Sequence, residues 1–382
     1  MKKYIKKDIQ EIKKKKVLIV TACDISNGGV SVFLYNMLSH IKCDGLCIHI
    51  YFPGEIISQA TADKFLELGI VLYIGCCSSG DAIRKIAYKD LECLTHLNNY
   101  DVIHSNSGKV WINYYSCYFG VKNDIPVRIV HSHSAMLPRK KAEIQKQDDI
   151  YRQFILENAT DFLACSVKAA RWLFGERFQN YTIFKNGIDL EKYEFDINTR
   201  EKYREELNLN NKFVVGHVGR FVKAKNHEFI LKIFKEIMKR SDNCLLLMVG
   251  EGELLEDIKE KSINMGINSN CIFLGGRMDI PGLLNVMDIF IFPSLFEGFP
   301  ISLLEAQANG LPCLMSNEIT EEVCLLKDTI MIPIENNEGF WAEQVLKCKM
   351  LHKERKIYSK ELKEAGYSIQ DSANCLWELY KG

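Results

Sequence analysis

Short apolar runs alternate with longer amphipathic segments along the first half of the chain. Each apolar run has the length of a buried strand, and each longer segment repeats its apolar positions with a helical period. Strands are expected at 17–22, 46–52, 70–74, 102–104, 127–130 and 162–165, and helices at 30–41, 60–68 and 168–174. This alternation is typical of βαβ units that build a parallel sheet.

The same alternation begins again in the second half, after an Asn-Gly turn at 186–187 and a charged helical stretch at about 191–209. Two doubly wound α/β domains in tandem are therefore expected, with a boundary near 187–200. In open α/β sheets ligands bind beyond the carboxyl ends of the strands, so a cleft between two facing domains is the expected site. The second set comprises strands at 213–218, 244–249, 272–274, 289–292 and 312–314, and helices at 227–238, 254–261, 280–287 and 301–309.

Composition narrows the class of protein. The 382 residues are 47% apolar and 26% charged, as in a soluble globular protein, and Lys+Arg and Asp+Glu both number 49. A dedicated nucleic-acid binder usually has a basic excess, so no nucleic-acid partner is expected. The 14 cysteines form no Cys-x-x-Cys pair, which indicates reduced thiols and the cytosol. No apolar run reaches the roughly 18–20 residues of a membrane span, and the run at 17–20 is predicted to be a buried strand and not a secretion signal.

The most informative stretch is Glu-Gly-Phe-Pro, which begins at Glu297 and follows the strand at 289–292. Pro300 is typical of a helix start, so a short helix is expected from Ile301. Its free N–H groups and Gly298 would form an anion site. Carboxylates accept hydrogen bonds from vicinal hydroxyls, such as those of sugars and ribose. The alternative makes Glu297 a carboxylate that complements the helix dipole, and the other carboxylate, at 305, a buried charge that needs a partner.

A basic loop follows the strand at 213–218. Arg220 and Lys225 are expected at the carboxyl end of that strand, and Asn226 is expected to cap the next helix. A guanidinium fork and an ammonium point charge together suit a diphosphate. In isolation, a solvated basic loop is the better explanation of these residues.

Two further loops of the first half carry candidate residues. Gly28 and Gly29 lack the spacing of a dinucleotide fingerprint but allow close backbone approach to a ligand. His131 and His133 follow the strand at 127–130 and suggest a polar contact to a sugar or its leaving group, with a structural role as the alternative. No carboxylate or cysteine accompanies them at useful spacing, and the chain has no Asp-x-Asp, so metal-held diphosphate chemistry is disfavoured.

Taken together, these motifs resemble those of retaining family-4 glycosyltransferases, which have the GT-B architecture. The turn at 185–189, Phe-Leu-Gly at 273–275 and Pro-Ser at 293–294 also match, and the similarity is strongest from 180 to 320. His-Ser-His-Ser at 131–134 and Ala-Cys-Ser at 164–166 resemble bacterial exopolysaccharide and capsule enzymes. The resemblance implies two Rossmann-like domains facing a central cleft: an acceptor-side domain at 1–189, a nucleotide-sugar domain at 190–365, and a last helix at 366–382 that crosses back to the first domain.

The resemblance also implies which residues contact which part of the donor. Whether His131 or His133 is the active-site histidine is left open. The implied set is Arg220, Lys225, Gly28 and Gly29 for the diphosphate; Glu297 with His131 or His133 as catalytic contacts at the transferred sugar; Gly298, Phe299, Pro300, Ile301 and Ser302 for contacts to the sugar and phosphate; Glu305 for the ribose; and Gly275, Gly276 and Arg277 beside the base.

The function implied is metal-independent, cofactor-free and retaining transfer of a hexose or N-acetylhexosamine. The donor would be a UDP-sugar and the acceptor a hydroxyl of a growing, lipid-linked polysaccharide or other glycan. A nucleotide-sugar isomerase (epimerase) of the same architecture and a non-catalytic partner subunit are the alternatives. Residues 1–16 are rich in lysine and carry isoleucines at helical spacing, so they are expected to lie on an anionic inner leaflet, aided by 139–141, or to form a solvated tail.

Overall fold

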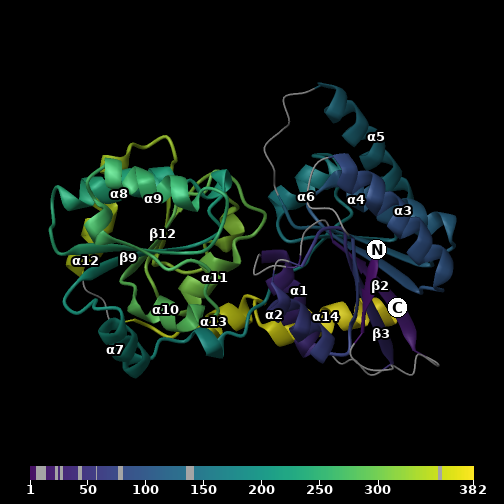
Figure 1. The fold of residues 1–382 in the computed structure, drawn as a ribbon, viewed down its shortest axis with the longest axis horizontal. Coiled ribbons are helices and arrows are strands. Elements are labelled where there is room, and N and C mark those ends of the chain that lie inside the picture. Colours follow the sequence, from purple (N-terminus) through teal and green to yellow (C-terminus); the bar gives the residue numbers. More distant parts are fainter. Residues whose placement is uncertain are drawn as a thin grey trace. The chain divides into compact units, whose positions relative to one another are not determined.

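The computed structural model describes residues 1–5, 14–21, 25, 29–41, 45–56, 58–75, 81–134, 142–351 and 355–382. These residues form two compact units. Unit 1 comprises Met1–Gly187 with Ile369–Gly382, and unit 2 comprises Ile188–Ser368. Each unit is a Rossmann-like α/β domain with helices on both faces of a sheet, as predicted (Figure 1). The chain leaves unit 1 after Gly187 and returns to it after Ser368, where the sequence predicted boundaries after 189 and 365.

Unit 1 has a sheet of order β1-β4-β3-β2-β5-β6-β7-β8. Only β1 runs antiparallel to its neighbour. Helices α3 to α6 cover one face, and α1, α2 and α14 cover the other (Figure 1). The bounds are β1 Lys2–Tyr4, β2 Lys15–Val20, β3 Leu46–Phe52, β4 Val71–Ile74, β5 Val102–Asn106, β6 Val127–Ser132, β7 Asp161–Ala164, β8 Thr182–Ile183, α1 Gly29–His40, α2 Gln59–Glu67, α3 Asp81–Leu97, α4 Val110–Lys122, α5 Ala142–Asn158, α6 Val167–Phe174 and α14 Ile369–Lys381.

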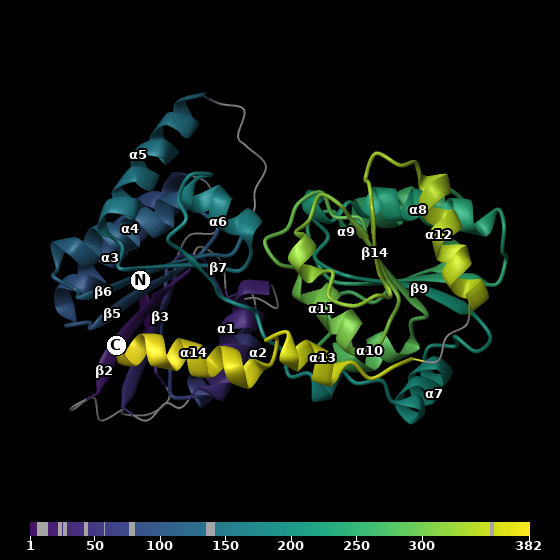
Figure 2. The same ribbon diagram turned by 180° about the vertical axis from the view of Figure 1, so that it is seen from behind.

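The last helix of the chain, α14, packs on α1 in unit 1 (Figure 2). Its Tyr380 is fully buried, and the Tyr380 hydroxyl shares a hydrogen bond of 2.7 Å with Nδ1 of His104 on β5. A segment more than 270 residues away in sequence therefore completes one face of the first sheet. This is the placement that the resemblance implied.

The start of the chain differs from expectation. Lys2–Tyr4 forms the edge strand β1, paired with β4, and Lys15 and Lys16 begin β2, so residues 1–16 are not one continuous tail. The helical spacing of the isoleucines at 5, 9 and 12 stays a prediction, because positions 9 and 12 are outside the described residues. Residues 6–13, the loop residue Gly28 and the basic residues 139–141 lie outside the described residues.

Unit 2 has a wholly parallel sheet of order β11-β10-β9-β12-β13-β14. Its strands β9, β10 and β12 have the bounds predicted from their apolar runs. Such apolar runs are easily recognised in the sequence, because parallel strands are buried on both faces. The bounds are β9 Phe213–Val218, β10 Cys244–Val249, β11 Cys271–Phe273, β12 Ile289–Phe292, β13 Cys313–Ser316, β14 Thr329–Ile332, α7 Ile197–Glu206, α8 His227–Met238, α9 Leu255–Asn264, α10 Ile280–Val286, α11 Ile301–Ala308, α12 Glu338–Leu351, α13 Ser359–Glu364, and the 3-10 turns η1 Glu191–Tyr193 and η2 Lys223–Lys225.

Candidate functional site

Two loops of unit 2 meet at the carboxyl ends of the neighbouring strands β9 and β12. The loop after β9 contains η2, and the loop after β12 leads into α11. The backbone N–H of Leu295 donates to the carbonyl of Ala224 at 2.8 Å, and Nδ2 of Asn226 donates to the carbonyl of Pro293 at 3.2 Å. Asn226 occupies the N-cap position of α8, as predicted, but its side chain accepts no capping hydrogen bond, and its Nδ2 binds the neighbouring loop.

Lys225 and Glu297 form an ion pair across these two loops. Lys225 Nζ lies 2.6 Å from Glu297 Oε1, without the alignment of a hydrogen bond, and 4.5 Å above the ring of Phe292. Both side chains are largely buried, so solvent screens their attraction less than at the surface. The structure thus brings together two residues that the sequence placed in separate motifs.

Arg220 stands at the exposed end of the same loop. No described residue forms an ion pair with its guanidinium, so its donor fork is available to an anion. The backbone beneath it is tightly packed, because a Cβ on Gly250 would lie 2.1 Å from the carbonyl oxygen of Gly219. Gly250 also has φ +147°, which favours glycine. No role was predicted for Gly250, although its position directly after the strand β10 was the available signal.

Glu305 lies inside α11 and is buried. The hydroxyl of Tyr193, in η1, donates to Glu305 Oε1 at 2.7 Å. Burial raises the pKa of Glu305 to about 7, while this hydrogen bond and the charge of Lys192 act to lower it. The partner of this buried carboxyl is therefore a neutral hydroxyl and not a cation, and Tyr193 is a residue that the sequence motifs did not point to.

The N-terminus of α11 has the geometry expected from its sequence. Pro300 precedes the first helical residue, and the backbone N–H groups of Ile301 and Ser302 have no acceptor among the described residues. Gly298 is buried, and the ring of Phe299 stacks on that of Tyr367 at 5.2 Å. Free N–H groups at a helix start can bind an anion.

The residues predicted beside the base follow β11. Gly275 has φ +64°, and its carbonyl accepts a hydrogen bond of 2.8 Å from the N–H of Gly250. Gly276 and Arg277 are exposed, and Arg277 forms a bidentate ion pair with Asp279. Gly275 is therefore bonded to the backbone of the loop after β10, whereas the Arg277 charge is already neutralised locally.

In unit 1 the structure brings His131 and His133 together at the carboxyl end of β6. Their ring centroids are 3.9 Å apart, and the ring of Phe33 on α1 packs against both. Burial lowers the pKa of His131 well below its usual value and that of His133 to about 3, and neighbouring imidazoles add to the effect at His131. Both rings are therefore neutral near pH 7. Gly29 begins α1 on the same face.

The buried polar atoms around these histidines have few partners. Both ring nitrogens of His131 lack a described hydrogen-bond partner, as do both amide atoms of Asn106 on the adjoining strand. Asn106 and His131 are in register on β5 and β6, so their side chains lie on one face of the sheet. A neutral imidazole can bind a hydroxyl but cannot supply positive charge to a phosphate.

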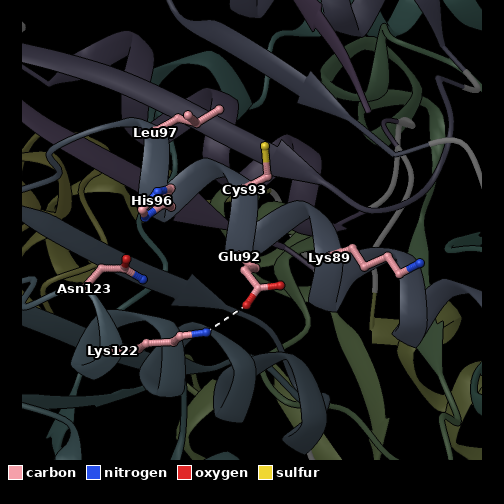
Figure 3. A pocket seen from close by; sticks show the side chains of 7 residues that line it. All are labelled: Lys89, Glu92, Cys93, His96, Leu97, Lys122 and Asn123. Carbon is pink, nitrogen blue, oxygen red and sulfur yellow. Dashed lines mark hydrogen bonds and ion pairs between the residues drawn. The ribbon is translucent and has the colours of Figure 1, made fainter.

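Three further observations concern the described residues as a whole. No group of three or more His, Cys, Asp or Glu side chains among them could hold a metal ion. No helix in the described ranges is long and apolar enough to cross a membrane. A surface pocket on α3 and α4 contains none of the predicted site residues (Figure 3). It is lined by Lys89, Glu92, Cys93, His96, Leu97, Lys122 and Asn123.

Comparison with known proteins identifies the family to which this chain is related. Residues 199–363 match the family described as Glycosyl transferases group 1. The putative glycosyltransferase EpsF of Bacillus subtilis is 32% identical over 266 residues, which is 67% of this chain and 68% of EpsF. The UDP-Gal:alpha-D-GlcNAc-diphosphoundecaprenol alpha-1,3-galactosyltransferase of Escherichia coli is 29% identical, covering 66% and 69% of the two chains.

Solved structures agree on the fold. Anabaena Alr3699/HepE in complex with UDP-glucose superposes with a TM-score of 0.78 at 17% identity, covering 96% of this chain and 99% of that one. The sequence match to EpsF extends beyond the second unit alone, since it spans two thirds of both proteins. This chain belongs to the group 1 glycosyltransferase family.

Proposed function

We propose that this glycosyltransferase moves a hexose or N-acetylhexosamine from a UDP-sugar to a hydroxyl of a lipid-linked saccharide, with retention of anomeric configuration and without a metal. The product would be a bacterial cell-surface polysaccharide. One observation carries the proposal: Arg220 and Lys225 follow β9, Glu297 follows β12 and pairs with Lys225, and Glu305 lies in α11, the helix that the second of these loops enters. The names of two relatives support the donor and acceptor, because the Escherichia coli enzyme uses UDP-Gal and a diphosphoundecaprenol-linked sugar, and HepE was solved with UDP-glucose.

The proposed chemistry assigns separate tasks to these side chains. The bond from the anomeric carbon to the diphosphate breaks, and the leaving phosphate oxygen gains negative charge. Arg220, Lys225 and the free N–H groups at the start of α11 stabilise that charge, which is the task of a metal ion in other enzymes. The acceptor oxygen forms the new bond to the anomeric carbon, and its proton goes to the leaving phosphate oxygen.

Glu297 and Glu305 would bind hydroxyl groups of the donor. Glu297 would accept hydrogen bonds from the transferred sugar, and its ion pair with Lys225 supports neighbouring subsites for the sugar and the phosphate. Glu305 would accept the ribose hydroxyls. In unit 1, the neutral His131 or His133 would contact a hydroxyl and not a phosphate.

A panel of nucleotide sugars tests the proposal most directly. Thermal shift and hydrolysis assays with UDP-, GDP-, ADP- and TDP-sugars are expected to single out a UDP-sugar, and an anomeric NMR assay of the product is expected to show retention. Interconversion of a free nucleotide sugar without any acceptor would instead identify an isomerase. Absence of binding to every nucleotide sugar would refute the proposed donor site.

Contact with the membrane surface follows from the proposed lipid-linked acceptor. We include peripheral attachment through residues 1–16 in the proposal on the basis of their lysine content. Deleting residues 1–13 is expected to reduce binding to anionic vesicles most at low salt, because exposed charges are screened over about 10 Å at 0.1 M salt. Equal binding by both forms would remove this part of the proposal.

A further inference from the structure

We propose that Tyr193 is a positioning residue for nucleotide binding: its hydroxyl holds the Glu305 carboxylate as the acceptor for the two ribose hydroxyls. This inference rests on the proposed function, in which Glu305 binds the ribose. In this proposal Tyr193 itself does not contact the nucleotide.

The Glu305 carboxylate is held through one of its two oxygens. The Tyr193 hydroxyl donates to Oε1 of Glu305 at 2.7 Å, and both side chains are buried. No described residue donates a hydrogen bond to Oε2, so that oxygen remains for a ligand. A single fixed bond to Oε1 restricts rotation of the carboxylate and thereby orients Oε2.

The Tyr193 hydroxyl is not needed to hold η1 in place. Nδ2 of Asn309, one turn after Glu305 on α11, donates to the backbone carbonyl of Tyr193 at 2.9 Å. The guanidinium of Arg355 in turn donates to Oδ1 of Asn309 at 2.5 Å. Since the backbone of η1 has its own anchor, removal of the hydroxyl alone is expected to leave the packing of η1 on α11 intact.

The charge of Glu305 depends on few neighbouring groups. The titratable groups that act on Glu305 are Tyr193 and Lys192, both in η1, and the adjoining strands β12 and β13 contribute no charged group to it. Burial brings the pKa of Glu305 to about 7, so small changes decide its charge near neutral pH. Burial and the nearby Glu305 and Asp189 raise the pKa of Tyr193, which therefore stays protonated and able to donate.

Removal of the Tyr193 hydroxyl changes the pKa of Glu305 in a direction that can be worked out. The hydrogen bond from Tyr193 lowers the pKa of Glu305, so its loss raises that pKa and favours the protonated acid. A protonated carboxyl has one acceptor fewer and offers a donor where the ribose also offers donors. Nucleotide affinity is therefore expected to fall as pH drops through the pKa of Glu305, and Tyr193→Phe is expected to move this fall to higher pH.

The test is calorimetry with UDP between pH 6.0 and 8.5 on three proteins. At pH 7, Tyr193→Phe is expected to weaken UDP binding roughly tenfold, because a hydrogen bond to a charged group is lost. Tyr358→Phe is the matched control, since the buried Tyr358 donates to Oδ2 of Asp328 at 2.8 Å elsewhere in unit 2. This control is expected to keep the wild-type affinity and pH profile. An unchanged profile in Tyr193→Phe would overturn the inference.

A second measurement separates failure of this inference from failure of the proposed function. Carboxyl 13C NMR of the ligand-free protein, with the Glu305 signal assigned by its loss in Glu305→Gln, is expected to show a higher midpoint in Tyr193→Phe than in wild type. An equal midpoint refutes the inference whatever the ligand is. Failure of wild-type protein to bind any nucleoside diphosphate, with the NMR shift present, would count against the proposed function and against ribose as the group that Glu305 binds.

Discussion

Lys225 and Glu297 are in contact although their proposed tasks differ, one at the diphosphate and the other at the transferred sugar. In the ligand-free protein each charge neutralises the other at 2.6 Å. A bound diphosphate would compete with Glu297 for Lys225. The ion pair therefore both orients Lys225 and weakens its attraction for an incoming phosphate, so removal of the Glu297 charge should lower turnover without weakening the binding of the nucleotide.

This contrast predicts separate effects for the two glutamates. Glu297→Gln is expected to lower turnover roughly ten- to a hundredfold, because a contact to the transferred sugar is lost in the transition state. It is expected to leave binding of sugar-free UDP as tight as in wild type or tighter, since Lys225 is released. Glu305→Gln is expected to weaken UDP binding by a similar factor. Steady-state kinetics and UDP calorimetry measure both effects.

The reverse pattern would exchange the assignments of these two residues. Wild-type turnover and affinity in both variants would show that the active site lies elsewhere. A useful control is Glu343→Gln, which removes an exposed carboxylate on α12 far along the chain from these loops and is expected to change neither quantity.

A second prediction at this scale concerns metal ions. Because Arg220 and Lys225 supply the positive charge at the proposed diphosphate site, transfer is expected to continue unchanged in excess EDTA. The measurement is the initial rate with and without chelator, after dialysis against it. A rate lost in chelator and restored by Mg²⁺ or Mn²⁺ would contradict the proposed metal-free mechanism.

At the scale of elements, a cluster of three arginines joins α7 and the segment after α12 to the start of β12. Asp288 directly precedes β12 and accepts from Arg200 at 2.5 Å and from the N–H of Val214 at 2.7 Å. Arg204 and Arg355 donate to carbonyls at the end of α10, including those of residues 286 and 287. The partly negative carbonyl end of the helix thus offsets charge that one carboxylate cannot balance alone.

Asp288→Asn is expected to lower the free energy of unfolding by about 3 kcal/mol, because it leaves buried guanidinium groups without their carboxylate. The measurement is urea denaturation, with the midpoint taken from the unfolding transition of unit 2. Glu343→Gln again serves as the control, since it breaks an exposed pair one turn apart on a helix and is expected to leave the midpoint unchanged. Equal midpoints for Asp288→Asn and wild type would show that the cluster does not stabilise the fold.

At the scale of the whole molecule, the two ends of the chain belong to one unit. Removal of residues 369–382 takes α14 from the face of unit 1 that it shares with α1, and exposes the apolar surface beneath it. Calorimetry is expected to show a lower melting temperature for unit 1 and an unchanged transition for unit 2. Tyr380→Phe, which removes only the hydrogen bond to His104, is expected to cost about 1 kcal/mol. Identical melting of the truncated and full chains would contradict this account of α14.

Many strands of the two sheets could be predicted from the sequence, because parallel strands are buried along their whole length. The runs 46–52, 213–218, 244–249 and 289–292 match observed strands, since a continuous apolar run is a local signal. Helix α4 was missed because it is apolar on most faces and has no helical period to detect. The edge strand β1 was missed because its three residues, two of them lysines, carry no apolar pattern.

At the site, the local chemistry follows from the sequence: a basic loop after one strand, a glycine turn and a helix start after another, and the carboxylates of Glu297 and Glu305. The partners of these side chains depend on the folded chain. Lys225 meets Glu297, and Tyr193 meets Glu305 from 112 residues away, because strand order and loop packing bring them together. The same holds for α14 on unit 1. Local patterns report burial and turn geometry, which depend on neighbours in sequence, whereas these contacts depend on the path of the chain through space.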